Sequence, residues 1–292
     1  MGSGIWTTCA YRTSLASCGI NDASTINTAS VNQFYKQSHL DKALDPHGVK
    51  IRECCDTEEH PNTIPVILAL DVTGSMGSAC AAVARQLDTI ITNLYEKVTD
   101  VEFMVMGIGD LAYDDAPLQV SQFESDVRIL DHLGKIYFER GGGGNGWESY
   151  TAAWYFALNH TRLDCWNRGK KGIIITMGDE PINPYMPARE LSKVLGYTVQ
   201  GDVDTKDLYK KVTEKYDVYH IIITDEEGCG PLYLDRDKKA WSSYLDGQHL
   251  IVGESTKLPE FITDIVTNSI GDVGFVTSDP GVVEVDENGI GW

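Results

Sequence analysis

Three oxygen-bearing side chains follow one another at every second position, immediately after an apolar run. The stretch LALDVTGSM places Asp71, Thr73 and Ser75 in the pattern Asp-x-Thr-x-Ser, directly before a run typical of a helix. A hard divalent cation takes oxygen ligands, and a loop that turns tightly at Gly74 and Gly77 can bring these three around one point. The spacing therefore indicates a cation site. The alternative is that Asp71 caps the helix and that Thr73 and Ser75 are turn residues.

Two later stretches carry further oxygen atoms of the same kind. Asp179 ends an apolar run, as Asp71 does, and the glycine-rich stretch GGGGNGWESY (141–150) contains Asn145 and Glu148. In an open α/β sheet, ligands bind outside the carboxyl ends of the strands. These residues are therefore candidates for the same site as the first loop.

Strand and helix patterns alternate from residue 66 to residue 270. Continuous apolar runs such as 66–71 are typical of strands covered on both faces, and 78–98 has apolar residues at helical spacing. The alternation predicts an α/β fold with a doubly wound, mainly parallel six-stranded sheet flanked by helices. The expected strands are 66–71, 101–110, 118–125, 171–180, 218–224 and 249–254, and the expected helices are 78–98, 128–139, 148–161, 188–196, 205–216, 237–247 and 258–270.

Composition divides the chain into three parts. Residues 1–63 are rich in Ser, Thr and Asn and only weakly periodic, so we expect an extension packed on the main domain, with one short helix in 39–49. Residues 64–270 contain the alternating pattern and form the main domain. Residues 271–292 carry acids and no base, which indicates a solvated acidic tail.

The net charge of −19 sets limits on the partners. Such a chain repels nucleic acid and anionic membranes, so we expect neither. No apolar run approaches the roughly 20 residues of a membrane-spanning helix, and the first residues do not have a secretory pattern. The cysteines number seven, without a C-x-x-C spacing, and indicate free thiols in a reducing, cytoplasmic compartment.

Nucleotide binding and catalysis have weaker signals. The sequence GIGDLA (107–112) is followed by acids instead of a helix, and the glycine-rich stretch lacks the Gly-Lys-Ser/Thr of a phosphate loop. His160 and Cys165 could form a catalytic pair, but residues five apart on a helix do not share a face well. Adjacent acids such as Asp114 and Asp115 more often decorate a turn. We therefore expect a protein that is not an enzyme.

Taken together and in this order, the three stretches resemble the von Willebrand factor A (VWA) domain with its metal-ion-dependent adhesion site. That family has an Asp-x-Ser/Thr-x-Ser loop, a glycine-rich loop carrying Thr or Asp, and a strand-terminal Asp. The resemblance covers about residues 64–270 and is closest to an uncharacterised bacterial and phage branch. Asp71, Thr73 and Ser75 match the first loop and Asp179 the third, whereas Asn145, with a carbonyl oxygen, or Glu148, with a carboxylate, would serve in the second.

The resemblance implies a fold and a function. It implies the sheet order 3-2-1-4-5-6, with the third strand antiparallel at the edge. It also implies a Mg²⁺ ion, or Mn²⁺ or Ca²⁺, whose open coordination position accepts an Asp or Glu from a partner protein, with Trp147 as a partner contact. Such domains often work beside MoxR-type AAA+ ATPases in bacteria, which implies a bacterial or phage-infected cytoplasm. The alternative is a rigid structural block of a phage virion or assembly, making contacts through the extension and the acidic tail.

Overall fold

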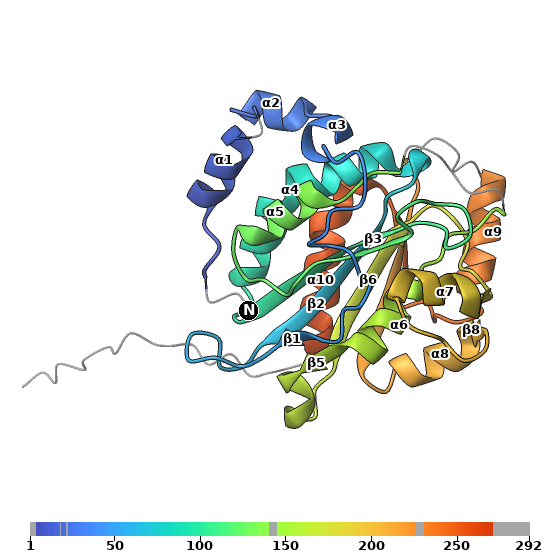
Figure 1. Cartoon of the computed structure of the whole chain (residues 1–292). Coiled ribbons are helices and arrows are strands. Elements are labelled where there is room, and N and C mark those ends of the chain that lie inside the picture. Colours follow the sequence, from blue (N-terminus) through green and yellow to red (C-terminus); the bar gives the residue numbers. More distant parts are fainter. Residues whose placement is uncertain (1–3, 18, 22, 140–144, 226–230, 271–292) are drawn as a thin grey trace, which may run out of the picture.

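A six-stranded sheet lies at the centre of the computed structural model, which describes residues 4–17, 19–21, 23–139, 145–225 and 231–270 (Figure 1). Every strand of this sheet is parallel to its neighbours except the edge strand β4, which is antiparallel to β3. Numbered along the sheet's own strands, the order is 3-2-1-4-5-6, so the predicted α/β sheet and its topology are confirmed. From edge to edge the strands are β10 (Leu250–Gly253), β9 (Tyr216–Ile223), β6 (Gly172–Gly178), β2 (Ile64–Asp71), β3 (Val101–Ile108) and β4 (Leu118–Val120).

Helices cover both faces of the sheet. One face carries α4 (Gly77–Tyr95), α5 (Arg128–Lys135) and α10 (Leu258–Ile270), and its apolar residues form one continuous buried cluster with the sheet. The other face carries a second cluster. Its helices are α6 (Thr151–His160), α7 (Ala188–Leu195), α8 (Thr205–Val212) and α9 (Pro231–Trp241).

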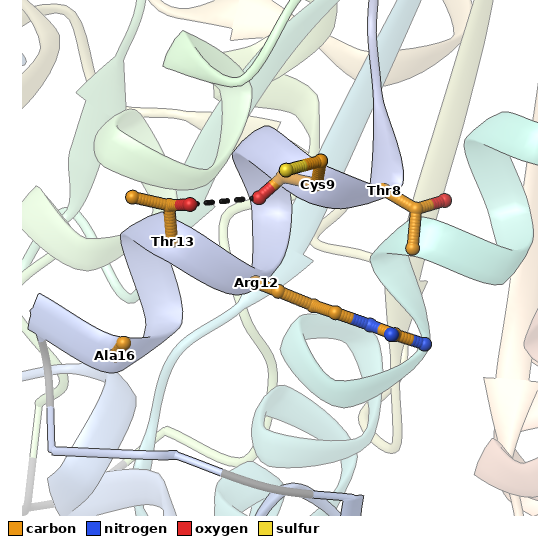
Figure 2. Close-up of a pocket in the computed structure, with 5 residues that line it drawn as sticks. All are labelled: Thr8, Cys9, Arg12, Thr13 and Ala16. Carbon is orange, nitrogen blue, oxygen red and sulfur yellow. Dashed lines mark hydrogen bonds between the residues drawn. The ribbon is translucent and has the colours of Figure 1, made fainter.

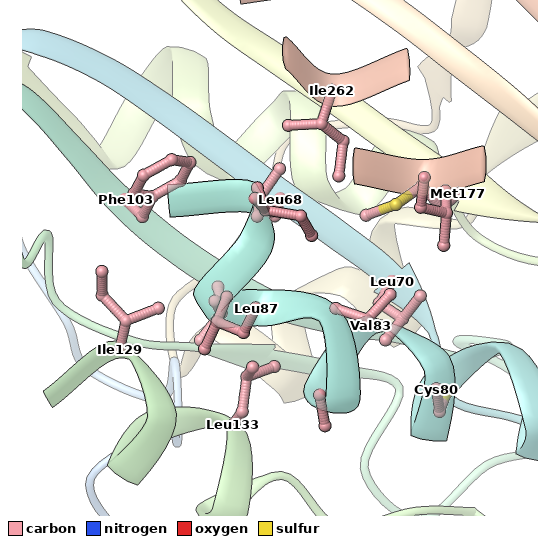
Figure 3. Close-up of a cluster of buried hydrophobic side chains, with 14 of the residues drawn as sticks. Leu68, Leu70, Cys80, Val83, Leu87, Phe103, Ile129, Leu133, Met177 and Ile262 are labelled. Carbon is pink, nitrogen blue, oxygen red and sulfur yellow. The ribbon is translucent and has the colours of Figure 1, made fainter. Parts of the chain in front are cut away.

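The position of the middle strand β2 explains why its sequence is continuously apolar. Leu68 and Leu70 point toward Val83 and Leu87 of α4 (Figure 3), while the alternate residues of the strand belong to the cluster on the opposite face. Because both faces are covered, every position from the second residue of the strand onward is buried. The one charged residue in this strand is therefore Asp71, at its carboxyl end.

The N-terminal segment, residues 4–35 apart from positions 18 and 22, packs on the outer side of α4 and α5 (Figure 1). It contains α1 (Thr8–Ser17), α2 (Ala23–Thr28) and α3 (Val31–Phe34). Trp6 donates a hydrogen bond to Asp88 Oδ1 at 2.8 Å, and its ring joins the same buried cluster as the sheet. Further along, β1 (Arg52–Cys54) pairs in parallel with β5 (Thr161–Leu163) outside the main sheet.

The predicted helix in 39–49 is wrong, because this stretch is a series of turns. The side chains of Asp41 and Asp45 accept hydrogen bonds from the backbone two residues on, at 2.8 and 2.9 Å. Gly48 has φ +75°, which ends any continuation of a right-handed helix. Local side-chain hydrogen bonds thus replace the helical ones.

Several boundaries also differ from the prediction, among them the end of the helix expected over 205–216, which is Val212. The strand expected over 118–125 is limited to Leu118–Val120, and the helix expected over 128–139 ends at Lys135. The residues after Lys135 leave the helix because Glu139 N–H donates to Val72 O, beside the first loop, at 2.8 Å. The helix expected over 237–247 runs instead from Pro231 to Trp241, with proline in the first helical position that suits it.

Some of the sequence-based expectations lie outside the described residues. These are the acidic tail 271–292, the glycines 141–144, Cys18 and Cys229. Among the residues that the structure does describe, no helix is long and apolar enough to cross a membrane. The five cysteines in that part of the chain are free thiols: Cys9, Cys54, Cys55, Cys80 and Cys165.

Candidate metal centre

The candidate site lies where the strand order reverses. From β2 the chain passes to β3 on one side, and the later strand β6 pairs with β2 on the other side. Asp71 is the last residue of β2 and Asp179 directly follows β6. Because Leu70 is paired with Met177, the two aspartates leave neighbouring strands at the same edge of the sheet. This is the place at which open α/β sheets bind their ligands.

Asp71 is fully buried and its carboxylate accepts three hydrogen bonds. Oδ1 accepts from the backbone N–H of Thr73 at 3.0 Å and from its hydroxyl at 2.7 Å, while Oδ2 accepts from the hydroxyl of Tyr150 at 2.8 Å. The backbone carbonyl of Asp71 accepts from the Cys80 thiol at 3.2 Å. Both the carboxylate and the backbone carbonyl of Asp71 thus accept hydrogen bonds, and the two bonds from Thr73 close the first loop beside Asp71.

The first and third loops are joined directly. The hydroxyl of Ser75 donates to Asp179 Oδ1 at 3.1 Å. Ser75 is partly exposed, whereas Asp179 and Thr73 are buried. The structure therefore brings four of the predicted ligands together as two hydroxyl–carboxylate pairs, Thr73 with Asp71 and Ser75 with Asp179.

The second loop lies beside the third, but its two candidates are placed differently. Glu148 forms a backbone bridge with Ile182 and is 4% exposed, and its Oε2 has no hydrogen-bond partner among the described residues. The side-chain oxygen of Asn145 instead accepts from the backbone N–H of Trp147 at 3.3 Å, which closes a local turn. Glu148 thus has a free, buried acceptor oxygen, while the oxygen of Asn145 is already engaged. Trp147 is 38% exposed and is accessible to another molecule.

Tyr150 is a site residue that sequence reasoning did not single out. Its ring is fully buried and packs edge-on against His220 and Trp241, at centroid distances of 5.1 and 5.3 Å. A Cβ at position 178 would lie 1.9 Å from the Tyr150 hydroxyl oxygen, so Gly178 makes room for the phenol next to Asp71. The available signals were a tyrosine closing the glycine-rich stretch and a glycine before the strand-end acid.

Burial dominates the electrostatics of the acids. It raises the pKa of Asp71 to about 6, although the Thr73 and Tyr150 hydrogen bonds oppose the shift. Burial, together with the negative charge of Asp71, raises the pKa of Asp179 to about 7. The pKa of Glu148 is raised by burial and by Asp71. Among the described residues no Lys, Arg or His forms an ion pair with any of these three acids.

Arg236 on α9 pairs with the residue that follows Asp179. Arg236 pairs with Glu180 at 2.8 Å and with Asp237 at 2.7 Å, so its charge is already shared between two other carboxylates. Within the part of the chain that the structure describes, the site therefore gathers buried carboxyl groups without a compensating base, and their pKa values are raised. A bound cation would supply that compensation.

The residues present fit a hard divalent cation. They offer carboxylate and hydroxyl oxygens, which Mg²⁺, Mn²⁺ and Ca²⁺ prefer, together with the unpartnered oxygen of Glu148. Within the described residues, no three His, Cys, Asp or Glu side chains are grouped as ligands of one metal ion. The candidate site is of a different type, because it joins two carboxylates, Asp71 and Asp179, with the hydroxyls of Thr73 and Ser75. Glu148 is not grouped with the two aspartates, so it would contribute through a water molecule. Both hydroxyls donate their protons to the aspartates, and their oxygens keep lone pairs with which they can ligate a cation.

The alternative of a helix cap is wrong. The N-cap residue of α4 is Met76, and no side chain caps that helix. Thr73 occupies the N-cap of the short 3₁₀ turn Gly74–Met76, also without a side-chain cap hydrogen bond. The Thr73 hydroxyl instead donates to Asp71, and the Ser75 hydroxyl donates to Asp179. Thr73 and Ser75 do lie in a turn, as that alternative expected.

The candidate catalytic groups are occupied in other ways. His160 contacts the Lys50 carbonyl at 3.1 Å and the Tyr197 hydroxyl at 2.8 Å through its two ring nitrogens. Cys165 is buried, and burial raises the pKa of its thiol to about 11, which disfavours the reactive thiolate. The Asp114 carboxylate accepts from the backbone N–H of Asp110 at 2.6 Å, as a turn residue does.

A Ser-His-Asp group occurs at the opposite end of the sheet. His60 lies 3.3 Å from Asp100 Oδ1 and 3.4 Å from Ser125 Oγ. Ser125 is fully buried, and its hydroxyl donates to the Gly4 carbonyl at 2.6 Å. The N-terminal segment therefore covers this serine, and the group fastens that segment to the domain.

A shallow hollow on the outer face of α1 is separate from the candidate site (Figure 2). It is lined by Thr8, Cys9, Arg12, Thr13 and Ala16. Thr13 donates to the Cys9 carbonyl at 2.9 Å within the helix. Most of these side chains are exposed, and the hollow is a surface feature of one helix.

The sequence matches no protein-family model and no curated protein. Among solved structures, the chain is similar to the pilus adhesin SpaC from Lactobacillus rhamnosus GG in its open conformation, with a TM-score of 0.45 and 13% identity. That match covers 71% of this chain and 30% of the adhesin, so the chain spans less than a third of the adhesin's length. It is also similar to the vWF domain of the type V pili tip protein Mfa5 from Porphyromonas gingivalis.

The Mfa5 match has a TM-score of 0.41 and 12% identity, and covers 70% of this chain and 94% of that domain. Both solved structures are distant in sequence.

Proposed function

We propose that this chain is a metal-dependent protein-interaction module. Its divalent cation, Mg²⁺ in the first place and Mn²⁺ or Ca²⁺ otherwise, is held by Asp71, Thr73, Ser75 and Asp179. The observation that carries the proposal is the meeting of two hydroxyl–carboxylate pairs at the carboxyl ends of two adjacent strands. Both aspartates are buried, and neither forms an ion pair with a base among the described residues. The resemblance of the three loops to VWA domains supports the same assignment.

Each residue has a distinct role in this proposal. Asp71 and Asp179 supply negative charge, while Thr73 and Ser75 supply neutral oxygens that leave the cation only partly neutralised. Glu148, with its unpartnered oxygen, is the better second-loop candidate than Asn145. A bound cation supplies an electrophilic centre that an incoming carboxylate can bind.

The partner is proposed to be a protein that offers Asp or Glu to the cation. Trp147 is exposed at the second loop and is suited to contact that partner, since aromatic side chains are frequent binding hot spots. A MoxR-type AAA+ ATPase is a candidate partner, and the cytoplasm of a bacterial or phage-infected cell is the proposed location. Assembly into a virion as a rigid block remains the alternative function.

Calorimetric titration of Mg²⁺ into chelator-stripped protein tests the cation site. The wild type is expected to bind, and Asp71→Ala and Ser75→Ala are expected to bind at least tenfold more weakly. Asp225→Ala is the matched control, because Asp225 also follows a strand and bonds a serine, Ser255, through N–H and hydroxyl at 2.8 and 2.6 Å. Equal binding by the wild type and Asp71→Ala would refute the site.

Capture of a partner on immobilised protein tests the second half of the proposal. Binding in Mg²⁺ should be reversed by EDTA and restored by Mg²⁺. Trp147→Ala should weaken partner binding but bind Mg²⁺ as the wild type does, since the indole offers no ligand oxygen. A partner that ignores both EDTA and Ser75→Ala would favour the structural-block alternative.

A further inference from the structure

The N-terminal segment reaches the candidate site through Tyr35. This residue follows α3, is 2% exposed, and donates its hydroxyl to the backbone carbonyl of Cys80 at 3.0 Å. Cys80 lies in the first turns of α4, and its thiol donates to the backbone carbonyl of Asp71 at 3.2 Å. One residue therefore separates the N-terminal segment from the main chain of a proposed cation ligand.

Tyr35 also contacts the chain that leads into the second loop. Its ring centroid lies 6.4 Å from that of Phe138, tilted by 46°. Phe138 covers the start of α4, since a Cβ on Gly77 would lie 3.6 Å from the Phe138 ring and 3.8 Å from Val31. The next residue, Glu139, donates its N–H to the carbonyl of Val72, between Asp71 and Thr73, at 2.8 Å.

These contacts meet around one loop. The first loop is fixed from the α4 side through Cys80 and from the side of the second loop through Glu139. Tyr35 contacts Cys80 directly through its hydroxyl, and through its ring it contacts Phe138, the residue before Glu139. Ligand positions must be held within about 0.5 Å to keep an affinity, so a support of this kind acts on binding at a distance.

We propose that Tyr35 is a positioning residue that couples docking of the N-terminal segment to cation binding at Asp71. The inference rests on the proposed function, because it concerns the same cation site. Coupling of this kind is reciprocal: if the docked segment strengthens cation binding, the cation strengthens docking of the segment by the same factor. Couplings of this type amount to about fivefold or more.

The chain provides a matched control for the substitution. Tyr11 is also in the N-terminal segment, is 3% exposed, and donates its hydroxyl to backbone carbonyls of α4, Ala84 at 3.0 Å and Arg85 at 3.1 Å. These carbonyls lie further along α4 than Cys80. Tyr35→Phe and Tyr11→Phe thus both remove hydrogen bonds from a tyrosine hydroxyl of the N-terminal segment to backbone carbonyls of α4. Only Tyr35→Phe removes one that leads to Asp71.

Mg²⁺ titration by calorimetry compares the two variants with the wild type. Tyr35→Phe is expected to weaken Mg²⁺ binding about fivefold or more, and Tyr11→Phe to stay within about twofold. Urea unfolding in chelator should show similar losses of stability for both, which separates positioning from a general structural effect. Wild-type affinity in Tyr35→Phe, or equal weakening in both variants, would overturn the inference while leaving the proposed function intact.

Hydrogen exchange on the wild type tests the reciprocal effect without a substitution in the N-terminal segment. Mg²⁺ is expected to slow exchange of amides in residues 31–35, including that of Tyr35, which donates to the Val31 carbonyl at 2.8 Å. The same ion should leave exchange in this segment unchanged in Asp71→Ala. Mg²⁺ binding without slower exchange overturns the inference alone. A wild type that binds no Mg²⁺, and so matches Asp71→Ala, overturns the proposed function and with it the inference.

Discussion

Single side chains show how burial determines the charge state of acids in this molecule. Asp71 and Asp179 are buried at the sheet edge, where their hydroxyl partners and a proposed cation stabilise the ionised form. Glu102 is the contrasting case on β3. It is 1% exposed, and neither carboxylate oxygen has a hydrogen-bond partner among the described residues. Cys54 and His60 compensate for the burial of Glu102 only in part.

Glu102→Gln should therefore change how stability depends on pH. Burial raises the pKa of Glu102, and interactions with Cys54 and His60 offset this only in part. As pH rises above the ordinary Glu value of about 4.3, the unfolded chain loses this proton while the folded chain keeps it. The folded state then binds more protons, so the wild-type free energy of unfolding falls with pH through that window until folded Glu102 also ionises.

The measurement is urea unfolding at several pH values for both proteins. The free energy of unfolding of Glu102→Gln minus that of the wild type should increase as pH rises through the window, then level off. Two parallel curves would contradict the prediction, because they would mean that Glu102 has the same proton affinity in the folded and unfolded chains.

At the scale of helices and strands, the sequence pattern predicts those elements that depend on interactions between residues close together in the chain. The run 66–71 is apolar because β2 is covered on both faces, and its terminal Asp71 marks the candidate site. The end of α5 was missed because it depends on a contact of Glu139 with the distant Val72. Tyr150 was missed for the same reason, since its partner Asp71 lies 79 positions away in sequence. Contacts between segments far apart in the chain leave little trace in a local pattern.

Gly178→Ala should test how tightly the end of β6 fits the helix that begins after the second loop. The new Cβ would overlap the hydroxyl of Tyr150, whose ring is enclosed by His220 and Trp241 and cannot move aside freely. We expect a loss of about 3 kcal/mol in the free energy of unfolding, as for an overpacked core. Gly247→Ala is the control, because its Cβ would meet no atom within 4 Å, and should change stability by about 0.5 kcal/mol or less. Comparable, small losses at both positions in urea unfolding would contradict the assigned packing.

At the scale of the whole molecule, the sheet and the N-terminal segment together determine where the loops lie. The alternation of strands and helices was sufficient to predict the sheet and, with the family resemblance, its order. The helices of the N-terminal segment were not predicted, because their apolar residues are sparse and are buried only against α4 and α5. The net charge of the chain, −19, also affects the site. In so acidic a chain, ionisation of the buried acids of the site is unfavourable until a cation is bound.

Cation binding should therefore raise the free energy of unfolding of the whole domain. A ligand that binds only the folded state adds RT ln(1 + [L]/Kd), which is about 2.7 kcal/mol at 100 times the dissociation constant. Urea unfolding of the wild type with and without Mg²⁺ at that concentration should show this gain. Asp71→Asn keeps the side-chain size and an acceptor oxygen for Thr73 but lacks the charge, so it should gain little from Mg²⁺ and be at least as stable as the wild type in chelator. Asp225→Asn, which changes the acid that follows β9, should retain the full gain in the free energy of unfolding that Mg²⁺ gives the wild type. If Mg²⁺ stabilises Asp71→Asn as much as the wild type, the ion binds elsewhere on the acidic surface, and the buried aspartates are not its ligands.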